Sequence, residues 1–166
     1  WGGKTVIYLA GWQIFGVSRA QAWEWSRSCL VEVAKIAADH GVTMVVEPQA
    51  VDTNLIEGCD DAIQLMEDVG APNVKLMFDT IHAMYRSEVL TDYVYQMGKN
   101  LHHLHLSDND RLPPGQGRGD FAALVAALKE IDYQGYLTME IAFNRRDVEP
   151  DKMARQAYDY MKPLVM

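Results

Sequence analysis

Short apolar runs alternate along the chain with longer stretches in which apolar residues recur every three or four positions. The short runs have the length of buried strands, and the longer stretches have the periodicity of amphipathic helices. Parallel sheets built from repeated strand-helix units show this alternation. We predict five strands, over residues 4–10, 42–47, 74–79, 101–106 and 136–141.

A helix is expected after each of these strands. Ser18 is a suitable N-cap for the first helix, which Gly41 ends, and Pro48 ends the second strand because proline cannot donate to a sheet ladder. The apolar spacing predicts the helices at residues 19–39, 60–69, 88–98, 121–131 and 151–161.

Five strand-helix units agree with two α/β architectures. An eight-stranded (β/α)8 TIM barrel needs about 250 residues, so the 166 residues here would hold only its last five units. A doubly wound domain of the flavodoxin type would be complete with five units, and the periodicity leaves both open. The chain begins at Trp1 without an initiator methionine, so we expect residues 1–166 to be the C-terminal part of one barrel domain.

The composition limits the kinds of molecule that the chain is expected to bind. The formal charge of −8 argues against nucleic acid and against an anionic membrane surface, which attract clustered Lys and Arg. No leader and no apolar run long enough to span a membrane is present in the sequence, and Cys29 and Cys59 have neither disulfide-framework nor metal-site spacing. We therefore expect a cytoplasmic protein with reduced thiols and a small-molecule ligand.

Residues able to bind a metal stand at or near the ends of four predicted strands. They are Glu47, Asp79, His105 and Glu140. Each alone is more often a solvated loop residue or a helix cap, but the carboxyl ends of parallel strands share one face, so four in register are expected to converge.

Three carboxylates and one imidazole suit a divalent cation with mixed oxygen and nitrogen ligands. Mn²⁺ is our first expectation, with Mg²⁺, Co²⁺ or Zn²⁺ as alternatives. The thiolates of a structural zinc site are missing from this set. Such a cation polarises a carbonyl and stabilises the enediolate formed when a proton leaves the neighbouring carbon.

Five sequence blocks carry a resemblance to a known family. VVEP at 45–48, FDTIH at 78–82, HLHLSDNDR at 103–111, PGQGRGDF at 114–121 and YLTMEI at 136–141 follow one another in the order and spacing of the xylose-isomerase-like barrel superfamily. The chain resembles in particular the ketose 3-epimerases related to D-tagatose and D-psicose 3-epimerase. The resemblance covers nearly the whole chain, from the fourth strand of the family's barrel to the eighth.

The resemblance implies roles for individual residues. The four strand-end residues match the family's metal ligands, and Glu47 and Glu140 also match the pair that exchanges protons with opposite faces of the sugar. His82 and Arg111 match residues that hold substrate oxygens. Relatives carry a further glutamate in a segment resembling EPLNRYETN, whereas this chain has the shorter EPQAVDTN with Asp52 at the nearest acidic position, so the substrate contact there is expected to differ.

Other functions on the same fold remain to be compared. Endonuclease IV relatives need additional histidines after the fourth of these strands, and residues 108–121 contain none. An aldose-ketose or hydroxypyruvate isomerase, an inosose dehydratase and a non-catalytic sugar-binding barrel fragment stay open as alternatives. The resemblance also implies a sugar substrate and a homo-oligomer, either dimer or tetramer.

Overall fold

The computed structural model describes residues 2–143 and 149–166. All five predicted strands are present and pair in parallel. Three of them are shorter than the apolar runs that predicted them, because the ends of those runs continue into loops. Their bounds are Thr5–Tyr8 for β1, Thr43–Val46 for β2, Val74–Asp79 for β3, Leu101–Leu106 for β4 and Leu137–Met139 for β5.

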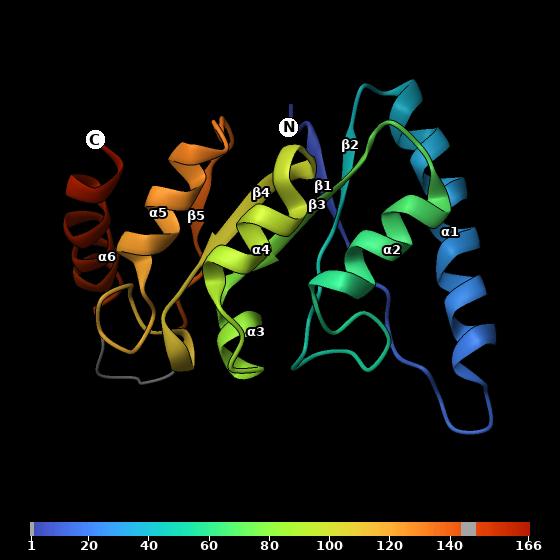
Figure 1. Ribbon diagram of the computed structural model, residues 1–166, viewed down its shortest axis with the longest axis horizontal. Coiled ribbons are helices and arrows are strands. Elements are labelled where there is room, and N and C mark those ends of the chain that lie inside the picture. The colour runs from blue at the N-terminus through green and yellow to red at the C-terminus, as the bar shows by residue number, and fades with distance from the viewer. Residues whose placement is uncertain (1, 144–148) are drawn as a thin grey trace.

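The order of the strands decides between the two architectures left open by the sequence. The sheet runs β1-β2-β3-β4-β5, so each strand pairs with its neighbours in the chain. A flavodoxin-type sheet would instead place its first strand between the second and the third. Sequential parallel order is that of a TIM-barrel wall, and the chain forms a partial barrel (Figure 1).

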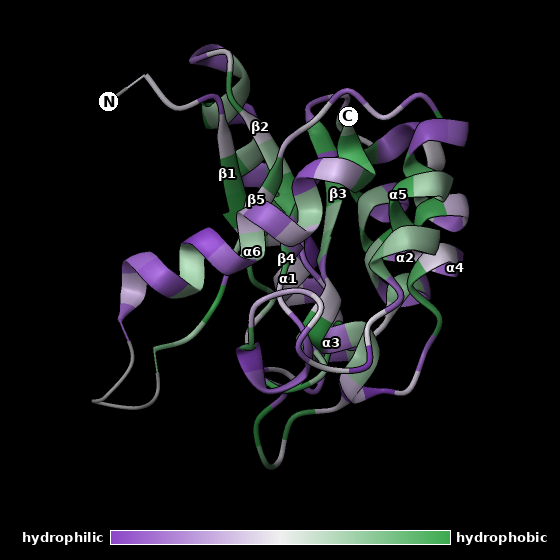
Figure 2. Ribbon diagram, turned by 90° about the vertical axis from the view of Figure 1, so that its left-hand side faces the viewer, coloured by the Kyte–Doolittle hydropathy of each residue, from purple (hydrophilic) through white to green (hydrophobic). Residues whose placement is uncertain are grey.

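The longer helices form a row beside this sheet. Contacts join α1 to α2, α2 to α4, α4 to α5 and α5 to α6, and α2, α4 and α5 lie together on one side of the strands (Figure 2). None of the helices in the described residues combines the length and hydropathy needed to cross a membrane. Their bounds are Arg19–Asp39 for α1, Cys59–Val69 for α2, Leu90–Met97 for α4, Phe121–Glu130 for α5 and Pro150–Val165 for α6.

A sixth helix was not predicted. Helix α3 (Thr80–Tyr85) begins directly after β3, so β3 is followed by two helices and not by one. Its six residues are too few to show a helical period in the sequence. The side chain of Asp79 accepts a hydrogen bond from Ile81 N at 3.0 Å and caps the helix. His82, for which no helix was predicted, therefore lies within a helix and not in a loop.

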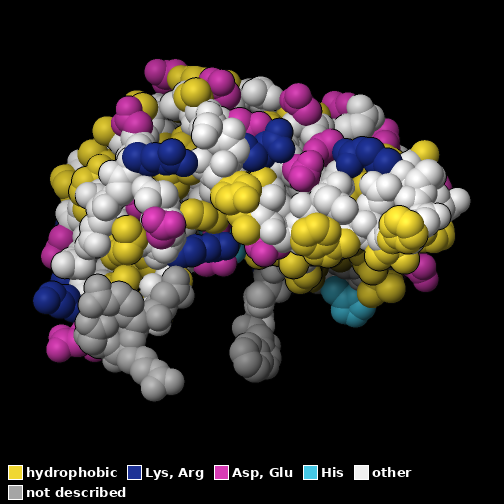
Figure 3. Space-filling view, turned by 90° about the horizontal axis from the view of Figure 1, so that it is seen from below, with side chains coloured by type: hydrophobic (Ala, Val, Ile, Leu, Met, Phe, Trp, Pro, Cys, Tyr) yellow, Lys and Arg dark blue, Asp and Glu magenta, His cyan; other side chains and the backbone are white. Residues whose placement is uncertain are grey.

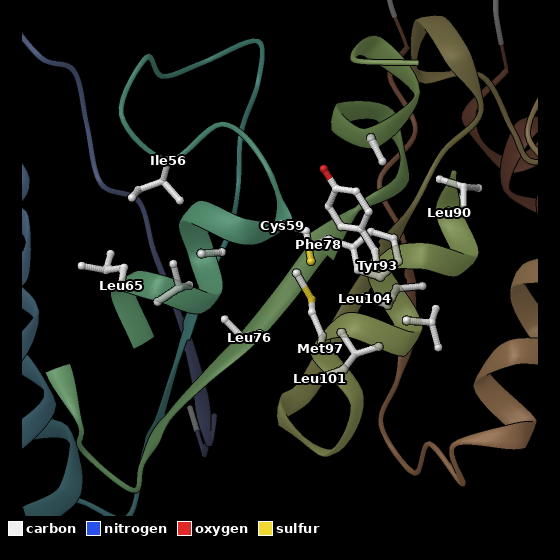
Figure 4. Packing of buried hydrophobic residues seen from close by; sticks show 14 of the residues in the cluster. Ile56, Cys59, Leu65, Leu76, Phe78, Leu90, Tyr93, Met97, Leu101 and Leu104 are labelled. Carbon is white, nitrogen blue, oxygen red and sulfur yellow. The ribbon is translucent and has the colours of Figure 1, made fainter. Parts of the chain in front are cut away.

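The core fills the space between the sheet and the row of helices. Phe78 of β3 and Tyr93 of α4 are buried with their ring centroids 5.0 Å apart, and Cys59, Met97 and Leu104 surround them (Figure 4). Burial of these apolar side chains between strands and helices holds the strands in one register. That register determines which strand-end side chains meet.

Candidate metal and substrate site

The four strand-end residues lie together at the carboxyl edge of the sheet. Asp79 pairs with His105 across β3 and β4, and Glu47 and Glu140 each come directly after a strand. The ladder continues one step at Glu140, whose N–H donates to Leu106 O at 2.9 Å. One ligand atom from each of the four lies within 4.8 Å of the others.

Burial differs within this cluster. The side chains of Glu47 and Asp79 are buried at 4% and 0% exposure, whereas those of His105 and Glu140 are partly open to solvent. The two ligand candidates from β2 and β3 are therefore shielded from solvent. The two from β4 and β5 are accessible. A small ligand can reach the cluster from the side of these two residues.

Hydrogen bonds orient the cluster. Gln49 Nε2 donates to Glu47 Oε2 at 2.9 Å, and His105 Nδ1 lies 2.5 Å from Glu140 Oε2. Asp79 is both the N-cap of α3 and a member of the cluster. Gln49 was not singled out from the sequence, because a glutamine three residues after the end of a strand has no distinctive pattern.

Arg111 contacts the cluster from the loop after β4. Its Nη1 forms ion pairs with Asp79 Oδ2 and, at 3.0 Å, with Glu140 Oε1. Asp110 and Arg111 both have left-handed backbone conformations, with φ of 59° and 60°. Two consecutive non-glycine residues in this region cost free energy, and such strain is concentrated at functional sites.

Crowding of carboxylates changes their protonation. Burial, together with the charges of Asp79 and Glu140, raises the pKa of Glu47 to about 8. Burial likewise raises the pKa of Asp79 to about 7. Burial opposes ionisation of Glu140 too, but its hydrogen bond with Asp79 and the charges of Arg111 and His105 outweigh that effect and lower its pKa.

The donor set fits a divalent cation. One ligand atom from each of three carboxylates and an imidazole lies within 4.8 Å of the others, and Arg111 provides one positive charge against them. Mixed oxygen and nitrogen donors of this kind are ligands for Mn²⁺, Mg²⁺, Co²⁺ or Zn²⁺. Raised carboxylate pKa values are the expected sign of negative charge that a cation would offset.

We predict that stability at alkaline pH depends on a cation. Because the pKa values of Glu47 and Asp79 are raised on folding, their contribution is fully present below about pH 4.5 and is lost as pH rises through about 7 to 8. In EDTA, the free energy of unfolding should fall by about 3 kcal/mol between pH 6 and pH 8.5. Mn²⁺ should reverse most of that loss, as measured by urea denaturation.

The matched control is Glu47→Gln, which removes one of the two groups and should flatten the pH dependence in EDTA. An equal slope in wild type and variant would show that the cluster does not cause it.

A cavity of about 420 Å³ lies beside Arg111, the residue that is paired with Asp79 and Glu140 of the cluster. His82 and Arg111 line it, as does Asp52, which is exposed on the loop after β2. His82 is 1% exposed, and neither of its ring nitrogens has a hydrogen-bond partner among the described residues. A buried polar group without a partner is costly unless a ligand satisfies it. The structure thus brings His82, Arg111 and Asp52 to the cavity beside the cluster.

Asp108, which was not singled out from the sequence, holds the loop after β4 in place. It is fully buried, and its two carboxylate oxygens accept backbone hydrogen bonds at 2.8 to 3.1 Å. A Cβ atom at Gly117 would lie 2.4 Å from Asp108 Oδ1, which explains glycine there. The glycine-rich block PGQGRGDF is the sequence feature that could have indicated this role of Asp108, because glycines permit close approach of the backbone to a carboxylate. The donors are the N–H groups of Asn109, Gly115, Gly117 and Gly119.

Comparison with curated proteins finds sugar epimerases. D-psicose 3-epimerase of Enterocloster bolteae is 33% identical over 112 residues, which are 67% of this chain and 37% of that protein. L-ribulose 3-epimerase of Methylomonas sp. strain DH-1 is 30% identical over 146 residues, covering 87% of this chain and 51% of its own length. The chain thus spans about half the length, or less, of these two relatives.

Comparison with solved structures gives the same result for the fold. The crystal structure of D-allulose 3-epimerase from Methylomonas sp. superposes with a TM-score of 0.87 at 26% identity, covering 98% of this chain and 64% of that one. Residues 1–164 match the xylose isomerase-like TIM barrel family. These matches confirm the resemblance carried by the five sequence blocks, and the chain belongs to the xylose isomerase-like TIM barrel family.

Proposed function

We propose that this chain is the C-terminal part of a single-domain, divalent-metal-dependent sugar epimerase, and specifically of a ketose 3-epimerase. The observation that carries the proposal is the cluster of Glu47, Asp79, His105 and Glu140 at the carboxyl edge of the sheet. Its two glutamates have pKa values shifted in opposite directions. The names of the similar proteins, which are 3-epimerases, support the same reaction class.

These four residues would hold the cation, with Mn²⁺ as the first candidate and Mg²⁺, Co²⁺ or Zn²⁺ as alternatives. When bound, the ion supplies Lewis-acid polarisation of the substrate carbonyl and offsets the charge of the enediolate. Asp79 and His105 serve only as ligands in this proposal.

Glu47 and Glu140 would move the protons. The ionised carboxylate of Glu140 accepts the proton from C3 of the ketose, and the C–H electron pair moves into the enediolate. A proton carried by Glu47 is then transferred to the opposite face of C3. The carbonyl then re-forms, C3 is inverted, and the reverse reaction uses the two groups in exchanged roles.

His82, Arg111 and Asp52 would bind substrate oxygens. His82 lines the cavity, and its two ring nitrogens have no hydrogen-bond partner among the described residues; Arg111 lies beside Glu140, where C3 would be placed. Asp52, which is exposed and lines the cavity from the loop after β2, would accept a hydrogen bond from a sugar hydroxyl.

We also propose that the enzyme acts in the cytoplasm as a homo-oligomer, a dimer or tetramer, without a nucleic-acid or membrane partner. The free thiols of Cys29 and Cys59 support a reducing compartment. The exposed side chains of Trp12 and Phe15 support self-association, since apolar side chains gathered on a surface mark contact sites.

Deuterium uptake from D2O into free ketoses, followed by NMR with the full-length protein, tests the reaction. We expect exchange at C3 with formation of the C3 epimer, and loss of both after treatment with EDTA. Restoration by Mn²⁺ would identify the cation dependence.

Two other outcomes would reassign the function. Exchange at C1 together with aldose formation would indicate an aldose-ketose isomerase. A metal-loaded protein that exchanges no proton in any ketose would contradict the epimerase proposal and favour a dehydratase or a non-catalytic sugar-binding protein.

A further inference from the structure

Two of the side chains proposed to bind substrate oxygens lie on different elements. His82 belongs to α3, and Arg111 belongs to the loop between β4 and α5, residues 107–120. Helix α3 has six residues, fewer than an isolated helix needs, and Asp110 and Arg111 hold left-handed backbone conformations. The relative position of the two side chains therefore depends on contacts that fix α3 and the loop.

Arg118 joins these two elements. It belongs to the loop, and its Nη2 donates to the carbonyl oxygen of Met84, in the last turn of α3, at 2.7 Å. The last carbonyl groups of a helix have no partner in a further turn, and cationic side chains stabilise that end. The contact thus holds the end of α3 that lies farther from Asp79.

The backbone of Arg118 is fixed as well. Its N–H donates to Asn109 Oδ1 at 3.0 Å, and Asn109 is two residues before Arg111. A Cβ atom at Gly117 would collide with the Asn109 side chain, so the two arms of the loop pass close together here. A path of contacts thus runs from the end of α3 through Arg118 and Asn109 to the left-handed residues Asp110 and Arg111.

An exposed arginine is not unusual on the end of the molecule toward which the strands point, because Lys and Arg side chains lie among acidic and apolar ones there (Figure 3). What matters for Arg118 is its partner, a backbone carbonyl of another element. Arg118 is not among the described residues that line the cavity of His82 and Arg111, and with Met84 and Gly119 it lines a separate cavity of about 320 Å³. Any effect of Arg118 on a sugar would therefore pass through other residues.

Resting on the proposed function, we propose that Arg118 is a positioning residue, which fixes the distance between His82 and Arg111 by tying the loop to the end of α3. The first turn of α3 is already attached to the end of β4, since Thr80 Oγ1 donates to Ser107 O at 2.6 Å. Arg118 holds the other end, so α3 is fixed at both ends. A sugar then meets both side chains in one geometry, and misplacement of such groups by about 1 Å costs up to about 10²-fold in rate.

The test measures kcat and KM of the full-length, Mn²⁺-loaded protein on a free ketohexose that it epimerises. Arg118→Ala should raise KM about tenfold and change kcat by less than about twofold, because the weakened contacts serve substrate and transition state equally. The midpoint of urea denaturation should stay within about 0.3 M of that of wild type, since Arg118 is exposed.

Two further variants make this result specific. Arg118→Lys, which keeps a donor for Met84 O, should restore most of the wild-type KM. Arg155→Ala, which removes an exposed arginine of α6, is the matched control and should behave as wild type. A wild-type KM in Arg118→Ala would overturn the proposal while leaving the epimerase intact.

A double-mutant cycle separates positioning from a general loosening of the protein. Once His82→Ala has removed one of the two groups, the distance between them no longer matters. Arg118→Ala should then change KM by less than about twofold. The same tenfold effect with and without His82 would mean that Arg118 does not act through the spacing of the two side chains.

If the wild-type protein exchanges no proton in any ketose, the proposed function fails, and the tie is tested by hydrogen-deuterium exchange of backbone amides. Arg118→Ala should speed exchange in residues 80–87 and 108–119 of the Mn²⁺-loaded protein by at least about fivefold, whereas Arg155→Ala should not. Unchanged exchange in both segments would show that Arg118 holds neither of them, and the inference would be wrong.

Discussion

Glutamine in place of either Glu47 or Glu140 should lower epimerisation at least about 10³-fold, because each inversion needs one group to take a proton and another to return it. The two variants should differ in proton exchange. Under the proposed mechanism, each retains one functional carboxylate and can therefore exchange the C3 proton of only one epimer. Glu47→Gln and Glu140→Gln should exchange opposite epimers in D2O, as observed by NMR of the separated sugars.

Two controls make this result specific. Glutamine can still ligate a cation through its amide oxygen, and bound Mn²⁺ is measured in each variant so that loss of the ion is not mistaken for loss of a proton carrier. Glu67→Gln, an exposed glutamate on α2, should behave as wild type. Exchange of the same epimer by both variants would mean that one group serves both faces.

The largest expected loss of stability comes from Asp108→Ala. Removal of this carboxylate leaves the N–H groups of Gly115, Gly117 and Gly119 without their acceptor, in a loop that packs against the end of β4. Buried donors left unsatisfied cost about 1 to 3 kcal/mol each, with partial relief from water. We expect the free energy of unfolding to fall by about 3 to 5 kcal/mol in urea.

The exposed Asp159→Ala serves as the matched control, and its effect should stay within about 0.5 kcal/mol. Because the same loop is continuous with Arg111, Asp108→Asn should also raise KM for sugars even where the protein remains folded. A stability loss below about 1 kcal/mol for Asp108→Ala would show that the loop does not depend on this residue.

The pattern of apolar and polar positions was sufficient for the five strands and for most helices. Strand runs and helical spacing are local properties, and Ser18 caps α1 as its position in the sequence predicts. Helix α3 could not be predicted in this way, since it is short and depends on Asp79 as its cap. Reciprocal hydrogen bonds between Thr80 Oγ1 and the backbone of Ser107, at 2.6 and 3.0 Å, also hold its first turn against the end of β4.

The residues of the site were largely visible in the sequence, but not their arrangement. That Glu47, Asp79, His105 and Glu140 should converge follows from parallel strands of equal direction. The sequence could not show that Arg111 reaches Asp79 and Glu140, because its position depends on two left-handed backbone conformations.

The sequence by itself determined the strand-helix alternation, the strand-end donors and the family, because these depend on residue type and spacing along the chain. Tertiary structure alone decided the barrel order of the strands, the opposite pKa shifts of the two glutamates, and the ion pairs of Arg111 with Asp79 and Glu140. Each of these depends on distances between residues far apart in the chain. Burial and charge act through those distances, and no local pattern of residues encodes them.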